Sequence, residues 1–539
     1  MSALSRRNLL TWAAALGGSV AVASRTEALA APPAPQQPVG PAARTAITVG
    51  PADVRFAGLT RGQNQRFASN PESVCLPATT EQVVAAVGAA VRRGKRIAVR
   101  SGGHCYEDFV DHPDVRVLID MTQMTAIAHD TKMKAIMVEA GAELGDVYDT
   151  LYKRWGVCLP GGSCYTVGVG GHVTGSGYGP LSRRHGYISD HVHAVEVVVV
   201  DAGGKARAVV ATRAANDPNR ELWWAHTGGG GGGFGVVTRF WFRAPDATGT
   251  DPAKLLPTPP REAWIHRREW AWDQMTPERF ARLLRNYGTW LERNSGPDSP
   301  YTGLFSRLEL TTRAYGPFHL VVQIDAGLPN AERLLNNFLN AVGEGVGVTP
   351  AVTDHRKLPW LHATGWPGMW MSNPTDRYKY KSSYHRKGFT DAQIAALYEQ
   401  LTNTDYAQLP FVVSIASFGG KVNTLPADAT ANPHRDSVMK LLWGTAWQAA
   451  ADDDRHVGWH QRFYQAVYRD TGGVPVPNDV TDGCFINYCD IDISDPAWNS
   501  SGVPWHDLYF KGNYPRLQQV KKAYDPGDVF KHSQSIRLP

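Results

Sequence analysis

The alternation of apolar and polar residues between positions 51 and 245 predicts helices and strands in turn. Thr79 and Gln82 have the spacing of a helix capping box, and Gly94 supplies the end of the same helix. Its apolar face consists of Val83, Val84, Val87 and Val91. Four valines on one side of a helix indicate a surface helix packed on a core.

Three β-rich runs follow this helix in the sequence. Residues 96–100 form one predicted strand. A second, at 195–200, leads into the Asp-Ala-Gly-Gly turn at 201–204, after which apolar residues resume at 206–211. Two such runs joined by a glycine turn predict a β-hairpin.

A proline-rich stretch at 245–260 separates two regions of different character. Five prolines with Asp, Thr and Gly between them favour a linker, so we place a boundary near residue 250, after a first domain at 51–250. Residues 251–480 are predicted to form a mixed α+β domain, and 481–539 to contain short β-like runs. The aromatic residues of the second region include Trp366, Trp370, Trp443 and Trp447.

The first thirty residues have the features of an export signal. Paired arginines, Arg6 and Arg7, precede an apolar stretch at 9–23 and small residues at 28–30. The apolar stretch is shorter than the roughly 20 residues of a spanning helix, and no later window reaches that length. We therefore expect a twin-arginine signal peptide at 1–30, an irregular leader at 31–50 and an extracytoplasmic protein; a frayed amphipathic helix is the alternative.

Composition excludes several classes of protein. With 43% hydrophobic and 19% charged residues the chain is neither disordered nor collagen-like. A formal net charge of +5 gives no reason to expect a nucleic-acid partner. Six cysteines are too few for a disulfide scaffold, and without a C-x-x-C pair no metal site is expected. The 53 glycines remain, and many of them are clustered.

Glycine-rich segments occur at 100–104, 161–179 and 228–233. Glycine allows backbone amides to converge on an anion without a Cβ in the way. One such cluster is more often a plain turn, but three in one domain predict a dinucleotide-sized cofactor. The run at 168–172 comes near the G-x-G-x-x-G fingerprint but is embedded in further glycines, so a fold other than the Rossmann fold is expected.

The segments Arg100–His104, Pro160–Cys164, Gly168–His172 and Tyr524–Phe530 resemble the berberine-bridge-enzyme-like flavin oxidases. The resemblance covers nearly all of the chain after the signal. It implies the α+β fold of the vanillyl-alcohol oxidase superfamily: a two-part, PCMH-type FAD-binding domain, completed by 481–539, and a substrate domain with an antiparallel sheet. Within the family the chain is most similar to actinobacterial oxidases of secondary metabolism.

The resemblance implies FAD held by two covalent bonds, from His104 to the 8α position and from Cys164 to C6 of the flavin. The other implied FAD contacts are Arg100, Ser101, Gly102, Gly103, Gly168, Val169, Gly170, Gly171, Gly177, Gly235, Val236, Asn513 and Tyr514. An ordinary loop histidine and an inert thiol are the alternatives for the two tethers. The pairing of Cys75, Cys105, Cys158, Cys484 and Cys489 is left open.

The resemblance also assigns catalytic residues. Oxidation of an alcohol requires a base for the hydroxyl proton, and Tyr488 occupies that place. Tyr178 matches a second active-site tyrosine, expected to donate a hydrogen bond to the phenolate. Phe418 stands where several relatives carry a tyrosine, which favours one oxidation per visit. The small Val169 is expected to admit O2, so that an oxidase producing hydrogen peroxide is favoured over a dehydrogenase.

The predicted function is oxidation of a secondary alcohol or hemiacetal carbon in a sugar, oligosaccharide or glycosylated natural product. Aromatic and basic residues at 366–387 are candidates to line an open pocket for such a bulky molecule. Ordinary core aromatics with a solvated basic face are the alternative, and no substrate contact is assigned. An oxidative cyclase or dehydrogenase of secondary metabolism on the same fold is the nearest alternative. A secreted carbohydrate-binding protein without activity is an alternative of another class, against which His104, Cys164 and Tyr488 argue. Neither a metal ion nor a membrane span is expected.

Overall fold

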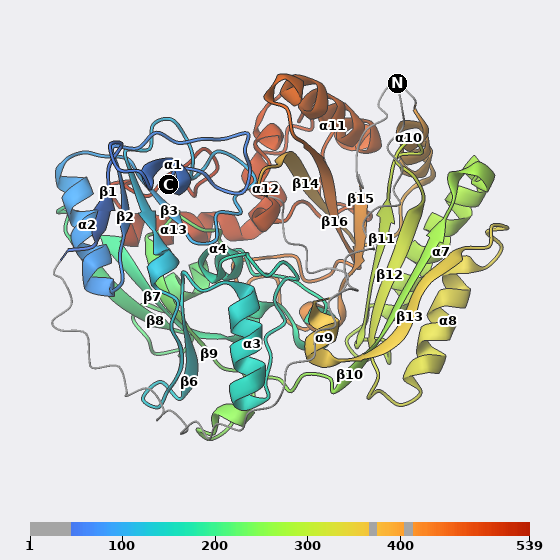
Figure 1. Cartoon of the computed structure of the whole chain (residues 1–539), viewed down its shortest axis with the longest axis horizontal. Helices are drawn as coiled ribbons and strands as arrows, with labels where there is room; N and C mark the ends of the chain where they lie inside the picture. Colours follow the sequence, from blue (N-terminus) through green and yellow to red (C-terminus); the bar gives the residue numbers. More distant parts are fainter. Residues whose placement is uncertain (1–44, 366–373, 404–412) are drawn as a thin grey trace, which may run out of the picture. The chain divides into compact units, whose positions relative to one another are not determined.

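The computed structural model describes residues 45–365, 374–403 and 413–539 (Figure 1). The predicted signal peptide and most of the predicted leader lie outside these ranges, as do Trp366 and Trp370. No helix in the described ranges is long and apolar enough to cross a membrane. The described residues from Thr45 onward form one compact unit.

A four-stranded sheet with the order β1-β2-β4-β3 begins the described chain. Its strands are β1 (Ile47–Val49), β2 (Ser73–Leu76), β3 (Ile97–Arg100) and β4 (Val117–Asp120), and they are parallel except for β1. Helix α1 (Phe56–Leu59) follows β1, and α2 (Thr80–Arg92) follows β2. The Thr79 side chain accepts from the Gln82 N–H, which confirms the predicted cap.

A second, five-stranded antiparallel sheet has the order β5-β6-β9-β7-β8. Its strands are β5 (Ile127–Asp130), β6 (Ala135–Glu139), β7 (Val192–Val200), β8 (Ala206–Thr212) and β9 (Val236–Phe242). Strands β7 and β8 confirm the predicted hairpin. Between β6 and β7 the chain forms helices α3 (Leu144–Trp155), α4 (Val169–Thr174) and α5 (Ser182–His185), and between β8 and β9 it forms α6 (Arg220–Ala225).

A seven-stranded antiparallel sheet draws all its strands from residues 262–447, in the order β13-β10-β12-β11-β15-β16-β14. The strands are β10 (Glu262–Trp270), β11 (Leu304–Leu310), β12 (Phe318–Asp325), β13 (Ala351–Pro359), β14 (Arg377–His385), β15 (Val413–Ser417) and β16 (Met439–Trp447). Helices α7 (Pro277–Asn294), α8 (Ala331–Gly343), α10 (Asp391–Thr402) and α11 (Asp453–Val467) pack beside it, and α9 (Trp360–Thr364) follows β13 (Figure 1). This sheet agrees with the α+β fold that the family resemblance implied.

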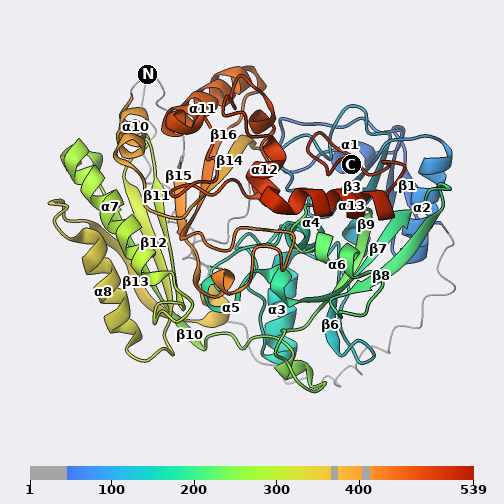
Figure 2. The ribbon, with the colours of Figure 1, turned by 180° about the vertical axis from the view of Figure 1, so that it is seen from behind.

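The C-terminal segment contains helices instead of the predicted β-like runs. Helices α12 (Trp505–Phe510) and α13 (Tyr514–Tyr524) follow short 3-10 turns, and α13 lies beside α6 (Figure 2). Cys484 and Phe485 are buried. Their backbone N–H groups donate to the Leu508 carbonyl of α12 and to the Ser382 Oγ of β14, so these residues do not form a strand of their own. Lys521 of α13 is fully buried and donates to the carbonyls of Gly233 and Phe530, which fixes this segment to the third glycine cluster. The predicted domain boundaries themselves stay predictions.

Candidate active site

A cavity of about 520 Å³ is lined by all three glycine clusters. Its walls also include residues of β11 and β14 and the segments 485–489 and 530–536. The predicted site residues on its surface are Arg100, Ser101, Gly102, Gly103, His104, Cys164, Gly168, Gly170, Gly171, Tyr178, Gly235 and Tyr488. Residues far apart in the sequence therefore meet at one cavity.

Two glycine loops are in direct backbone contact beside this cavity. A Cβ added to Gly102 would lie 2.3 Å from the Gly168 nitrogen, and one added to Gly168 would lie 2.0 Å from the Ser101 Oγ. The Ser101 hydroxyl donates to the Ala140 carbonyl at 2.6 Å, and the Gly170 N–H donates to the same carbonyl at 2.9 Å. Only glycine permits this approach, because any side chain would push the loops apart.

The two predicted tethers face the cavity from these loops. His104 Nε2 lies 2.9 Å from the Thr166 hydroxyl, and the Cys164 Sγ lies 3.6 Å from the same oxygen. Burial lowers the pKa of His104 to about 4, so the imidazole is neutral and its nitrogen lone pair is available. A neutral imidazole and a thiol on one cavity, in loops rich in glycine, fit a bound flavin.

Five of the predicted FAD contacts do not line the cavity. Val169 and Val236 are buried in the hydrophobic core, and the expectation that Val169 admits O2 at the flavin stays a prediction. Gly177 lies behind His172: an added Cβ would meet the His172 Nε2 at 2.6 Å. Asn513 donates to the carbonyls of Ala427, Thr430 and Ala431, and Tyr514 stacks on His506. None of these five residues is part of the cavity lining.

Tyr488 lies in a 3-10 turn, Ile486–Tyr488, and its ring contacts two side chains that the sequence did not indicate: Tyr106, which lines the cavity, and Lys440, which does not. Tyr106 stacks on it with ring centroids 5.5 Å apart, and the Lys440 Nζ lies 3.8 Å from its ring centroid. Burial raises the pKa of Tyr488 to about 12, while the Arg307 guanidinium acts in the opposite direction. Burial also lowers the pKa of Lys440, and the charge of Arg307 adds to that effect.

The sequence contains a weak indication for each of these two residues, Tyr106 and Lys440. Tyr106 follows the predicted tether His104 by two residues. Lys440 is a lone cation in the otherwise apolar run Val438–Leu442, where a buried strand would not carry a lysine without a partner. No sequence pattern joins either residue to Tyr488, because the pairing depends on tertiary structure.

The expected role of Tyr178 needs correction. Its hydroxyl donates to the Ser417 carbonyl, so the donor that was predicted to serve the Tyr488 phenolate is engaged elsewhere. Phe418 is fully buried and packs on Tyr178, with ring centroids 4.9 Å apart. Both residues therefore shape the cavity wall, and Phe418 itself does not reach the cavity surface.

Tyrosines form one wall of the cavity. Tyr106 lies with its ring centroid 4.6 Å from that of Tyr380 and 5.8 Å from that of Tyr378. The Tyr378 hydroxyl is buried and makes no hydrogen bond within the described part of the chain. Of the residues 366–387 that were candidates to line a pocket, Tyr378 and Tyr380 face the cavity. Lys379 and Lys381 point to the other side of β14.

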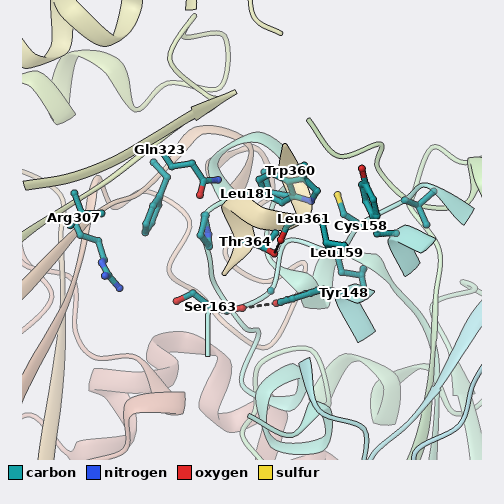
Figure 3. A pocket seen from close by; sticks show the side chains of 17 residues that line it. Tyr148, Cys158, Leu159, Ser163, Leu181, Arg307, Gln323, Trp360, Leu361 and Thr364 are labelled. Atoms are coloured by element: carbon teal, nitrogen blue, oxygen red, sulfur yellow. Dashed lines mark hydrogen bonds between the residues drawn. The ribbon is translucent and has the colours of Figure 1, made fainter. Parts of the chain in front are cut away.

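A second, mainly apolar cavity of about 40 Å³ adjoins the first at Gly162, Ser163 and Arg307. Figure 3 shows Trp360, Leu361 and Thr364 between Cys158 on one side and Arg307 and Gln323 on the other. Burial raises the pKa of Cys158 to about 12, which makes its thiol a poor nucleophile. All six cysteines lie in the described ranges, and none of them forms a disulfide there. Those ranges contain no group of three potential metal ligands.

An α+β fold of this topology, with glycine loops, a histidine and a cysteine on one cavity, defines a flavoprotein of the vanillyl-alcohol oxidase type. Residues 71–208 match the family profile of an FAD binding domain, and 484–537 match the profile "Berberine and berberine like". The chain belongs to the berberine-bridge-enzyme-like family of FAD-linked oxidoreductases. This result confirms the family predicted from the glycine motifs.

Three comparisons describe its relatives. The chain is 51% identical to an aclacinomycin-N/aclacinomycin-A oxidase of Streptomyces galilaeus, with 100% of this chain and 99% of that protein covered. It is 30% identical to a hexose oxidase of Chondrus crispus, over 90% of this chain and 93% of that protein. The structure of a glycopeptide hexose oxidase in complex with teicoplanin superposes with a TM-score of 0.86 at 49% identity, covering 91% of this chain and 99% of that one.

The contact between the two glycine loops predicts a specific failure of cofactor binding. We expect Gly102→Ala to lower the flavin bound per polypeptide several-fold, because its Cβ would clash with the backbone at Gly168. Flavin absorbance relative to protein concentration measures this. Gly58→Ala is the matched control, since an added Cβ there meets nothing within 4 Å. A normal flavin content in Gly102→Ala would contradict the requirement for the contact.

Proposed function

We propose that this chain is an FAD-dependent oxidase that removes a hydride from a secondary alcohol or hemiacetal carbon of a sugar or glycosylated natural product. The observation that carries the proposal is the placement of Tyr488, with Lys440 over its ring, on the cavity of His104 and Cys164. His104 and Cys164 would hold the FAD, which would supply a two-electron acceptor for the hydride and would be reoxidised by O2 with release of hydrogen peroxide. The other steps belong to the side chains of the cavity.

Tyr488 accepts the hydroxyl proton of the substrate. Burial penalises a lone phenolate and a lone ammonium, as the raised pKa of Tyr488 and the lowered pKa of Lys440 indicate. With the Lys440 Nζ 3.8 Å from the Tyr488 ring centroid, the two charges offset each other when they occur together. We infer that Lys440 offsets the charge of the phenolate from the ring face, in addition to the Arg307 guanidinium, which lowers the pKa of Tyr488.

The tyrosine wall suits a sugar or fused-ring substrate. Aromatic faces stack on such rings, and the buried Tyr378 hydroxyl offers a hydrogen-bonding group without a protein partner among the described residues. The relatives are named for aclacinomycin and hexose, and one was crystallised with teicoplanin; these names support a glycosylated or sugar substrate here. With Phe418 in place of a second tyrosine, one oxidation per visit is proposed.

Oxidative ring closure is the second candidate on the same site. It shares hydride removal with the leading proposal and differs in the product, because an internal nucleophile traps the oxidised carbon. Mass analysis of products distinguishes a new carbonyl from a new ring. The paired arginines at Arg6 and Arg7 support export by the twin-arginine route, and we propose an extracytoplasmic location.

Replacing the base tests the chemistry. Tyr488→Phe removes one oxygen and keeps the ring, so we expect normal flavin content and a kcat lower by about 100- to 10,000-fold. Peroxide release over a panel of sugars and glycosylated antibiotics is the assay. Tyr287→Phe, in a buried tyrosine outside the cavity, is the matched control. Unchanged turnover in Tyr488→Phe would assign the base to another residue.

Lys440→Met should change the pH dependence of the same assay. Turnover requires the phenolate, so it rises as pH passes the pKa of Tyr488. Without the nearby cation that pKa is higher, and we expect the rising limb to move up by about 1–3 pH units. A limb at the wild-type pH would contradict the pairing of Lys440 with Tyr488.

Tyr378→Phe tests the substrate wall. The free protein should be as stable as the wild type or more stable, because a buried hydroxyl without a partner is removed. The KM should rise about two- to tenfold, the value of one hydrogen bond to substrate. Thermal unfolding and steady-state kinetics on the same preparations measure the two effects. An unchanged KM would exclude Tyr378 from substrate binding.

A further inference from the structure

A cluster of five charged side chains lies behind the tyrosine wall. Lys379 and Lys381 of β14 meet the carboxylates of Glu107, Asp490 and Asp492, and each of the five residues is more than nine-tenths buried. Charges are costly to bury, and an apolar core of the same volume is often at least as stable. The cluster therefore calls for an explanation other than stability.

Asp490 is the centre of the cluster. Its Oδ1 lies 2.8 Å from the Lys379 Nζ, and its Oδ2 lies 2.7 Å from the Lys381 Nζ. Glu107 accepts from Lys379 and also from the Ile491 N–H at 3.2 Å. The cluster thus ties three segments together: strand β14, the loop after His104, and the segment after Tyr488.

Members of the cluster are neighbours in sequence of the cavity tyrosines. Glu107 follows Tyr106, and Asp490 is two residues after Tyr488. Side chains alternate along a strand, so β14 presents Tyr378 and Tyr380 to the cavity and its lysines to the carboxylates. The ion pairs on one face of β14 therefore help to fix the position of Tyr378 and Tyr380 on its other face.

The residues before Tyr488 are also held by β14. The Phe485 N–H donates to the Ser382 Oγ at 2.9 Å, and the same oxygen lies 3.4 Å from the Tyr488 carbonyl. Ser382 adjoins Lys381 on the strand, so β14 holds the chain on both sides of Tyr488. Asn487 adds a bond from its Nδ2 to the His172 carbonyl at 2.8 Å.

We propose that this buried ionic cluster positions Tyr488: Lys379 and Lys381 hold Asp490 and Asp492, and thereby set the place of the Tyr488 hydroxyl on the cavity. The five residues are positioning residues, because they act through Tyr488 and do not themselves line the cavity. The inference rests on the proposed role of Tyr488 as the base. It predicts that losing a charge in the cluster impairs the proton transfer more than it impairs substrate binding.

Three variants test this on the flavin-loaded protein: Lys381→Met, the near-isosteric Asp492→Asn, and the double variant. For Lys381→Met we expect flavin content as in the wild type, KM within about twofold, kcat lower by about 10- to 100-fold, and a shifted pH limb. The double variant leaves no uncompensated charge from this pair and should recover part of the kcat. Arg377→Met is the matched control. Arg377 is on the same strand as Lys381, but its ion pair with Asp453 of α11 lies outside the cluster.

A wild-type kcat and pH limb in Lys381→Met, with only a lower unfolding temperature, would overturn the proposal, as would an equal loss of kcat in Arg377→Met. Should Lys381→Met fail to fold, Asp492→Asn decides: a lower kcat at unchanged KM supports positioning, and a wild-type kcat contradicts it. Tyr488→Phe distinguishes a failure of the proposed base from a failure of the proposed positioning by the cluster. If that variant keeps its turnover the proposed base is wrong, whereas loss there with normal kcat in the cluster variants refutes positioning alone.

Discussion

The contact between the glycine loops at Gly102 and Gly168 is the constraint on which the site depends. Two backbones meet there at distances that no Cβ would allow. The contact brings His104 and Cys164 to the same Thr166 hydroxyl, although 60 positions separate them in the sequence. The shape of the cavity follows from this approach, because the loops that form the contact also line the cavity, and the proposed flavin attachment depends on the same contact.

Buried charge governs the chemistry on the other side of the cavity. Tyr488 and Lys440 each lose the stabilisation of water, and each is more favourable in its charged form when the other is charged. Behind them, two lysines and three carboxylates fix the strand and the turn that carry the tyrosines. Breaking one buried pair of this kind typically costs about 3–5 kcal/mol. Such a cost favours a single arrangement of the cluster, which suits the proposed role of Tyr488 as a precisely placed base.

Local features were predictable from the sequence and tertiary pairings were not. The Thr79 cap and the hairpin of β7 and β8 depend on neighbouring residues, and both predictions were confirmed. Lys440 reaches Tyr488 across two segments, and the Tyr178 hydroxyl bonds to Ser417, so no local pattern reveals either. Asn513 and Tyr514 are polar and near a family motif, yet their hydrogen bonds and stacking are satisfied within the protein, away from the cavity.

We propose that two loops in glycine-mediated contact hold one flavin from both sides. Mass spectrometry of a protease digest of the purified protein tests it most directly. The expected result is a pair of peptides, one containing His104 and the other Cys164, joined through a single FAD. Release of the flavin on acid precipitation, or its attachment to only one of the two peptides, would contradict the claim.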